Sequence, residues 1–124
     1  MIPRGYAETG VGLLIDVTAS DLANVNPFSL SGGLVSTVAE VGSFWRALFS
    51  QRLIRAGSIE RMQQDRGLFD VDLPGGKRAF CHPGALAGQS TWALYVPADD
   101  AVVVFPITRN GSRSQLDSIA AFLD

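Results

Sequence analysis

The only histidine and the only cysteine of the chain are adjacent, in the stretch CHPGALAGQS, Cys81 to Ser90. An imidazole titrates near neutral pH, so it can act as a general acid or base. This stretch is therefore the first candidate for chemistry.

A self-contained catalytic site is not expected from these residues. A Ser–His–Asp triad needs a base beside the hydroxyl and a carboxylate that orients it. Ser90, Asp99 and Asp100 lie near His82 in sequence, but Trp92 stands where a G-x-S-x-G elbow has its last glycine. The sequence has no H-x-x-x-H, no C-x-x-C and no glycine-rich phosphate loop, so we expect no metal and no other cofactor.

Composition excludes other classes of function. The 124 residues carry a net charge of -2, with 47% hydrophobic and 18% charged residues, as expected for one packed domain. No basic stripe is present, so nucleic-acid binding is not expected. There is no run of 18 apolar residues and no signal-peptide pattern, so we expect no membrane segment, and the localisation stays unknown.

The clearest predicted element is a helix from Val38 to Gln51. Thr37 and Glu40 have the spacing of a capping box, in which each side chain accepts a hydrogen bond from the other residue's backbone N–H. Apolar residues then recur at helical spacing and predict a buried stripe: Val41, Phe44, Trp45, Leu48 and Phe49. Ser58 is expected to cap a second, short helix from Ile59 to Gln64.

The rest of the chain predicts strands and a last helix. GLFDVDL and KRAFCH flank a Pro-Gly-Gly turn, and TWALYV and AVVVFPI flank Pro-Ala-Asp-Asp, so each pair reads as a hairpin. Residues 11–17 predict one short strand near the start. Ser114 opens a predicted helix from Gln115 to Leu123. This order predicts an α+β fold, with an antiparallel four-stranded sheet and packing helices.

The strand AVVVF is apolar on both faces, so the sheet needs cover on both sides. The predicted helices supply little of that cover. We therefore expect a partner layer, and a homo-oligomer is one way to provide it.

Several segments together resemble the penicillin-recognising serine hydrolases, which comprise class C β-lactamases, D-alanyl-D-alanine carboxypeptidases and related esterases. SGGLVSTVAEVGSFWRALFSQRLI is similar to the family's segment of small-Gly-Gly-Leu-x-Ser-Thr followed by a helix. PRGY resembles a segment upstream of that helix, and VVVFPITRN resembles the family's apolar strand. HPGALAG, His82 to Gly88, resembles the family's third motif, K-T-G or H-x-G.

The resemblance implies roles for residues of this motif. His82 would assist proton traffic as a catalytic residue and would hold an anionic substrate group electrostatically, and the Ala85 N–H would be an oxyanion-hole donor. Gly84 would let the substrate lie against the strand. Pro83 stands at the substrate-binding position where the family commonly has Thr, so a hydroxyl and a backbone donor are lost. Arg109 is either part of a turn or a group that attracts a substrate carboxylate.

The family's other two motifs are missing. S-x-x-K is absent, because the only lysine is Lys77 and Pro74 stands three residues before it. Y-x-N is absent after both Tyr6 and Tyr95. The resemblance thus implies that residues 1–124 are a single incomplete β-lactamase-like domain, the C-terminal portion of a serine hydrolase, inactive alone. Its partner would be the N-terminal half of that hydrolase or another copy of this chain, and the complete protein would take a small acyl or peptide substrate.

Two other interpretations stay open. The chain could be a non-catalytic binding or assembly module that oligomerises through an exposed sheet face. His82 could be a structural histidine at a strand end. Cys81 alternates with His82 along the strand, so we expect it to face the opposite layer as a buried, inert thiol.

Overall fold

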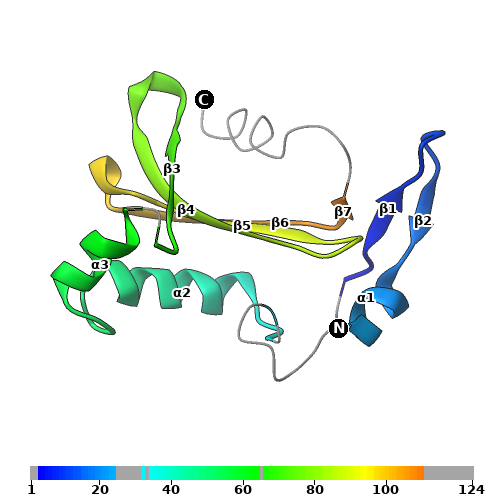
Figure 1. Ribbon diagram of the computed structural model, residues 1–124, viewed down its shortest axis with the longest axis horizontal. Helices are drawn as coiled ribbons and strands as arrows, with labels where there is room; N and C mark the ends of the chain where they lie inside the picture. Colours follow the sequence, from blue (N-terminus) through cyan, green and yellow to red (C-terminus); the bar gives the residue numbers. More distant parts are fainter. Residues whose placement is uncertain (1–2, 25–31, 33, 65, 111–124) are drawn as a thin grey trace.

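The computed structural model describes residues 3–24, 32, 34–64 and 66–110, and it has the predicted α+β architecture with a four-stranded antiparallel sheet (Figure 1). The helices are α1 (Thr18–Asn24), α2 (Val38–Phe49) and α3 (Ala56–Met62), with short 3₁₀ turns η1 (Pro74–Gly76) and η2 (Pro97–Asp99). The strands are β1 (Tyr6–Glu8), β2 (Leu14–Asp16), β3 (Phe69–Asp72), β4 (Arg78–Ala85), β5 (Ser90–Val96), β6 (Ala101–Ile107) and β7 (Arg109–Asn110).

The main sheet has the order β3-β4-β5-β6, and each strand pairs antiparallel with its neighbour in sequence. Both predicted hairpins are present, β3–β4 around η1 and β5–β6 around η2. In the first turn Gly75 and Gly76 both have φ of 76°, a conformation that favours glycine. A second, three-stranded sheet has the order β2-β1-β7, so the start of the chain pairs with the segment that follows β6.

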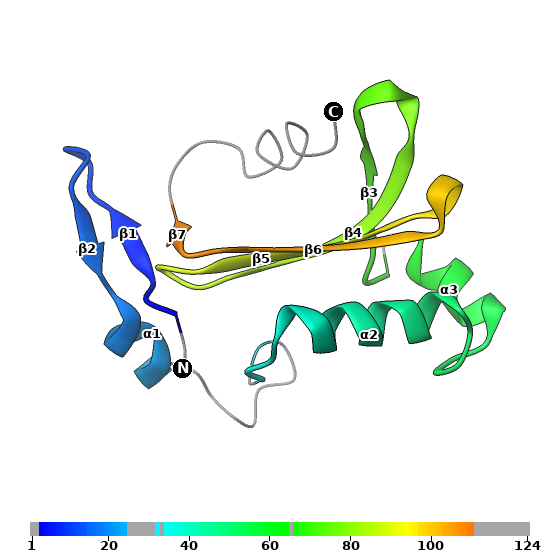
Figure 2. The same ribbon diagram turned by 180° about the vertical axis from the view of Figure 1, so that it is seen from behind.

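Helix α2 lies along one face of the main sheet (Figure 2), and its predicted capping box is confirmed. The Thr37 Oγ1 accepts a hydrogen bond from the Glu40 N–H at 3.2 Å, and a Glu40 carboxylate oxygen accepts one from the Thr37 N–H at 2.9 Å. Trp45 and Leu48 are buried against the sheet. The sequence thus fixes both where this helix begins and which side faces the core.

Other element predictions need correction. Helix α3 begins at Ala56 with Arg55 as its N-cap, so Ser58 is not the cap and the helix starts earlier than Ile59. Ile59 is buried, and its burial holds this short helix in place without a side-chain cap. Helix α1 was not predicted at all, and residues 109–110 form a strand instead of a turn. The predicted helix from 115 to 123 lies outside the described residues.

Buried apolar side chains occupy both faces of the main sheet. One cluster lies between α2 and the sheet and contains Trp45, Leu68 and Ala93. The other lies on the opposite face and contains Leu73, Ala79, Cys81, Leu94 and Val96. The alternation of side chains along β4 and β5 therefore separates two apolar layers.

Candidate functional site

Strand β4 is paired along only part of its outer edge. Strand β3 covers the first half, with Phe69 opposite Cys81 and Asp72 opposite Arg78. On the other side β5 pairs with β4 as far as its end, where Ala85 lies opposite Ser90. Among the described residues no strand pairs with the outer edge of residues 82–85, the segment of the H-x-G motif. We call this segment the open edge.

The hydrogen bonding of the hairpin sets the direction of the backbone groups at the open edge. The Leu86 N–H donates to the Gln89 carbonyl at 2.7 Å, which closes the turn between β4 and β5. Since antiparallel neighbours alternate, the backbone groups of Gly84 face β5 and those of Ala85 face outward. Position 83 also faces outward, where a proline costs the β4–β5 ladder no donor. The Ala85 N–H is therefore the outward-facing donor of this segment.

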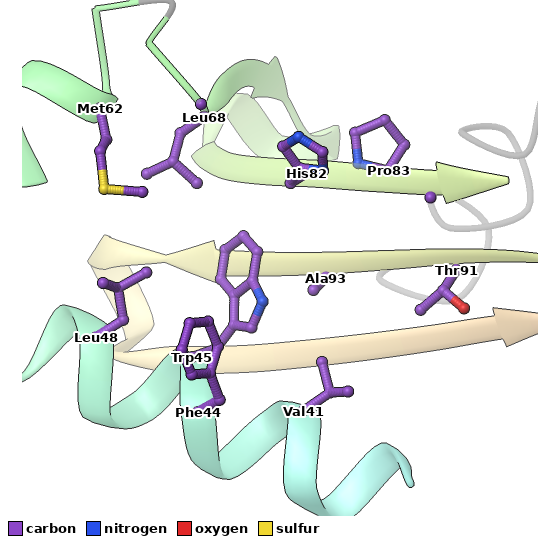
Figure 3. Close-up of a pocket in the computed structure, with 12 residues that line it drawn as sticks. Val41, Phe44, Trp45, Leu48, Met62, Leu68, His82, Pro83, Thr91 and Ala93 are labelled. Carbon is purple, nitrogen blue, oxygen red and sulfur yellow. The ribbon is translucent and has the colours of Figure 1, made fainter. Parts of the chain in front are cut away.

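A groove lies beside the open edge, between α2 and the β4–β5 strands (Figure 3). Its volume is about 400 Å³. It is lined by Val41, Phe44, Trp45, Leu48, Met62, Gly67, Leu68, His82, Pro83, Gly84, Thr91 and Ala93. Three residues of the predicted site, His82, Pro83 and Gly84, thus come together on the wall of one groove.

His82 is exposed, and its ring centroid lies 5.6 Å from that of Phe69. Within the described part of the chain its imidazole has no hydrogen-bond partner, so the nitrogens are available to a ligand. Gly84 lies two residues further along the same face, and a Cβ atom added there would meet nothing within 4 Å. On this face of β4, the His82 imidazole therefore lies next to the unoccupied space above Gly84.

Cys81 faces the other way, as alternation predicts. It is fully buried in the cluster on the opposite face of the sheet. Burial, and to a smaller extent the charge of Asp70, raises the pKa of its thiol above the ordinary value. A raised pKa keeps the sulfur protonated at neutral pH, so this cysteine is a packing residue.

Among the described residues, no triad forms around the imidazole. Ser90 pairs with Ala85, so its side chain lies on the sheet face opposite to that of His82. Asp99 holds the ammonium group of Lys77 at 2.8 Å, and Asp100 accepts a hydrogen bond from the Tyr95 hydroxyl at 3.0 Å.

The two remaining predicted residues lie in different places. Ala85 ends β4 at the open edge, next to the groove, although its side chain does not line it. Arg109 lies on β7, away from the groove lining, and its guanidinium group donates to a Glu8 carboxylate oxygen at 2.6 Å. The sequence grouped Arg109 with His82, but the structure does not bring the two together.

The motif's turn is held by a residue that sequence reasoning missed. The Asp21 side chain is buried, and its carboxylate accepts hydrogen bonds from the Ala87 N–H at 3.1 Å and the Gly88 N–H at 2.8 Å. Asp21 belongs to α1, 66 residues before Ala87, and no local pattern in the sequence points to this contact.

Gly88 has a second constraint. A Cβ atom there would clash with the Val17 side chain and would lie 2.6 Å from the Gly5 carbonyl carbon and 2.8 Å from the Tyr6 nitrogen. The Gly88 carbonyl also accepts a hydrogen bond from the Tyr6 N–H at 3.0 Å. The N-terminal segment, and α1 with it, thus supports the turn that ends the open edge.

We compared the chain with protein-family models, with curated proteins and with solved structures. None of the three comparisons found a match. The case for a function therefore stands on the residues and the geometry alone.

Two further observations concern the described part of the chain. It contains no group of three or more histidine, cysteine or acidic side chains placed to hold a metal ion. None of its helices has the length and apolar character needed to cross a bilayer.

Proposed function

We propose that this chain is the C-terminal region of a β-lactamase-like serine hydrolase, of the D-Ala-D-Ala carboxypeptidase, β-lactamase or esterase type. In this proposal it supplies the H-x-G strand, one wall of an acyl-transfer site. The other wall carries the attacking serine and comes from residues of another segment. The family resemblance of the motifs suggests this role, and the open edge of β4 is the observation that supports it best.

The open edge has the features that an acyl-transfer wall requires. A carbonyl under attack develops negative charge on its oxygen, and a fixed N–H stabilises that charge. The Ala85 N–H faces outward from the edge and can take this role. Loss of one such donor typically raises the barrier by about 2.7–4 kcal/mol. Gly84 leaves room for the substrate, because nothing occupies the position of its missing Cβ.

His82 is the proton-carrying group in this proposal. Its imidazole is exposed on the groove wall and has no hydrogen-bond partner among the described residues. It can therefore relay a proton between the attacking hydroxyl and the leaving group. Pro83 fills the substrate-binding position without a hydroxyl, and Arg109 would attract a substrate carboxylate only if it left Glu8.

The nucleophile must come from elsewhere. S-x-x-K and Y-x-N do not occur in the 124 residues, so the chain has neither the serine nor the lysine that would deprotonate it. In the proposal the partner is the N-terminal half of the same hydrolase. Another copy of this chain could cover the sheet, but it could not supply these motifs.

A second candidate is a non-catalytic module that oligomerises through an exposed sheet face. The described residues favour it less, since Cys81 and Leu94 on the face opposite α2 are fully buried. Exposed apolar side chains gather instead on the N-terminal hairpin, at Val11, Leu13, Leu14 and Ile15. This hairpin is the surface on which an assembly role would rest.

The first test is the coding sequence of about two hundred codons, an ordinary domain length, upstream of Met1. The proposal expects S-x-x-K and Y-x-N there. If they are absent and Met1 is the start of translation, the proposal fails.

The second test uses intact-mass spectrometry after incubation with a penicillin and with an activated ester. Residues 1–124 alone should gain no covalent adduct, because they lack the nucleophile. The longer protein should gain one acyl group on the serine of S-x-x-K. A stoichiometric adduct on the isolated chain would contradict the assignment of the nucleophile to another segment.

A further inference from the structure

We propose that the groove between α2 and the β4–β5 strands binds the apolar acyl group of an uncharged substrate. This inference rests on the proposed function, because it names the substrate class of the same site. It is argued from the lining of the groove, from its size and from the charges around it.

The lining is apolar along most of its length. Side chains of α2 form one wall, and Met62 and Leu68 close one end (Figure 3). Among the described lining residues, the side-chain polar groups are the Trp45 indole N–H on α2 and the His82 and Thr91 side chains on the β strands. A groove of this kind suits a ligand with an apolar body and one polar group at its end. The polar group would lie toward the open edge, where acyl transfer is proposed.

The size of the groove limits the ligand. A volume of about 400 Å³ lies toward the small end of ordinary small-molecule sites, which span about 300–1,000 Å³. An acyl chain of roughly six to eight carbons, or a phenyl ring with a short linker, is within this limit. A peptide of several residues is too large to fit inside and could only lie along the edge.

The charges favour an uncharged ligand. Apart from the His82 imidazole, no ionisable side chain is among the described residues that line the groove. Arg78 on β4 pairs with the Asp70 carboxylate, and Arg109 on β7, away from the lining, pairs with that of Glu8. An anion buried in the groove would lose its hydration without meeting a permanently charged counterion, which is unfavourable. A neutral ester or amide carries no such penalty.

The probe for the test is N-(4-nitrophenyl)hexanamide, an uncharged amide that absorbs where tryptophan emits. Trp45 lines the groove, whereas Trp92 packs on the opposite face of the sheet. Titration of residues 1–124 should quench tryptophan fluorescence in a saturable way. The matched control is N-(4-nitrophenyl)succinamate, which ends in a carboxylate and should bind at least tenfold more weakly. Equal affinity for the two ligands would overturn the proposal that the groove selects an uncharged substrate.

Two substitutions on α2 locate the binding. Val41→Phe fills the groove and should weaken binding of the neutral probe at least tenfold. Val38→Phe, on the same helix but outside the lining, should change it less than twofold. Unchanged binding in the Val41 variant overturns the proposal. If that variant does not fold, the Phe44→Ala variant provides the test. Phe44 lines the groove and is half exposed, so its removal should disturb the core little. It should weaken binding several-fold, and unchanged binding counts against the groove.

The outcomes separate this inference from the proposed function. Binding of the probe needs no nucleophile, so it tests the groove by itself. If the probe binds in the groove but no S-x-x-K lies upstream, the serine-hydrolase proposal fails and the proposal of an uncharged, apolar ligand stands. If S-x-x-K lies upstream but the probe does not bind in the groove, only the proposal of an uncharged, apolar ligand fails.

Discussion

Gly84 and Gly88 stand four residues apart and have different structural requirements. Gly84 faces open space beside the groove, because a Cβ atom added there would meet nothing within 4 Å. Gly88 lies against the backbone of Gly5, where a Cβ atom has no room. The resemblance assigned both glycines to one motif, but their surroundings differ: Gly84 borders the groove, and Gly88 packs against the N-terminal segment.

Substitution of each glycine by alanine should separate these two requirements. Gly88→Ala should lower the free energy of unfolding by about 2–3 kcal/mol, because the added methyl group forces the N-terminal segment away. Gly84→Ala should change it by no more than about 0.5 kcal/mol. Urea unfolding followed by circular dichroism measures both. Equal losses in the two variants would contradict the close approach of Gly5 to Gly88.

Asp21 should be the main side-chain anchor of the motif's turn. Asp21→Ala removes a buried acceptor of two backbone N–H groups, and the free energy of unfolding should fall by about 2–3 kcal/mol. Asp21→Asn keeps one acceptor oxygen, so its loss should be smaller. Ser20→Ala, at the exposed neighbouring position, is the matched control. Urea unfolding compares the three, and a Ser20 variant as unstable as the Asp21→Ala variant would refute the anchor.

Among the elements, α2 is the one that its own sequence specifies best. Its capping box acts within four residues, and its apolar stripe repeats at the helical period. The Glu40 carboxylate accepts hydrogen bonds from the Thr37 N–H, the Thr37 hydroxyl and the Ser36 hydroxyl. These bonds, the first of them most, lower the pKa of Glu40 below its ordinary value.

This lowered pKa gives the start of α2 a defined pH dependence. Because folding favours the ionised carboxylate, the stabilisation is complete above the unfolded-state pKa of about 4.3. It is lost as the pH falls through the lower pKa of the folded state. Wild type should therefore be more stable than the Glu40→Gln variant at pH 6. This difference in stability should shrink as the pH falls toward 3. Thermal unfolding of both proteins from pH 6 to pH 3 measures it, and a gap that does not change with pH would contradict this account.

How well an element could be predicted from the sequence follows the range of its interactions. The β3–β4 and β5–β6 hairpins and α2 depend on neighbours in sequence, and all three were predicted. The β1–β7 pairing joins Tyr6 to Arg109, and no local pattern indicates such a distant partner. Ser58 has a side chain that can cap a helix, but α3 begins earlier, at Ala56, and is held by the burial of Ile59.

The same limit applies to the candidate site. Strand alternation predicted that Cys81 is buried and that His82 faces the other layer, and both are observed. The open edge could not be predicted, since it depends on where β3 begins relative to β4. The anchoring role of Asp21 could not be predicted either, because its partners lie far along the chain.

At the scale of the whole molecule, the described part of the chain leaves apolar surface uncovered. Large side chains of the N-terminal hairpin are more than half exposed, at Val11, Leu13 and Ile15. Contiguous apolar surface of this kind marks contact sites in many proteins. The homo-oligomer expected from the sequence stays a prediction, and this hairpin is where it is best tested.

Sedimentation should show a mass above that of one chain, rising with protein concentration. Ile15→Lys should shift the distribution toward the monomer, because a charge on β2 opposes apolar contact. Leu53→Lys, at an equally exposed position far along the chain, is the control. A clean monomer at high concentration would contradict self-association, and equal shifts in both variants would contradict the role of the hairpin.

Pro83 has a consequence for solubility. A strand edge with unpaired backbone groups invites other molecules to add strand after strand, as fibrils do. The pyrrolidine ring stands in the middle of the open edge on its outward side, so an incoming strand finds one rung of the ladder missing. Among the described residues, no strand pairs with the neighbouring Ala85 N–H, which leaves this donor open to a single small acceptor. Pro83 thus disfavours the addition of further strands at the open edge, while the edge stays accessible to a small molecule.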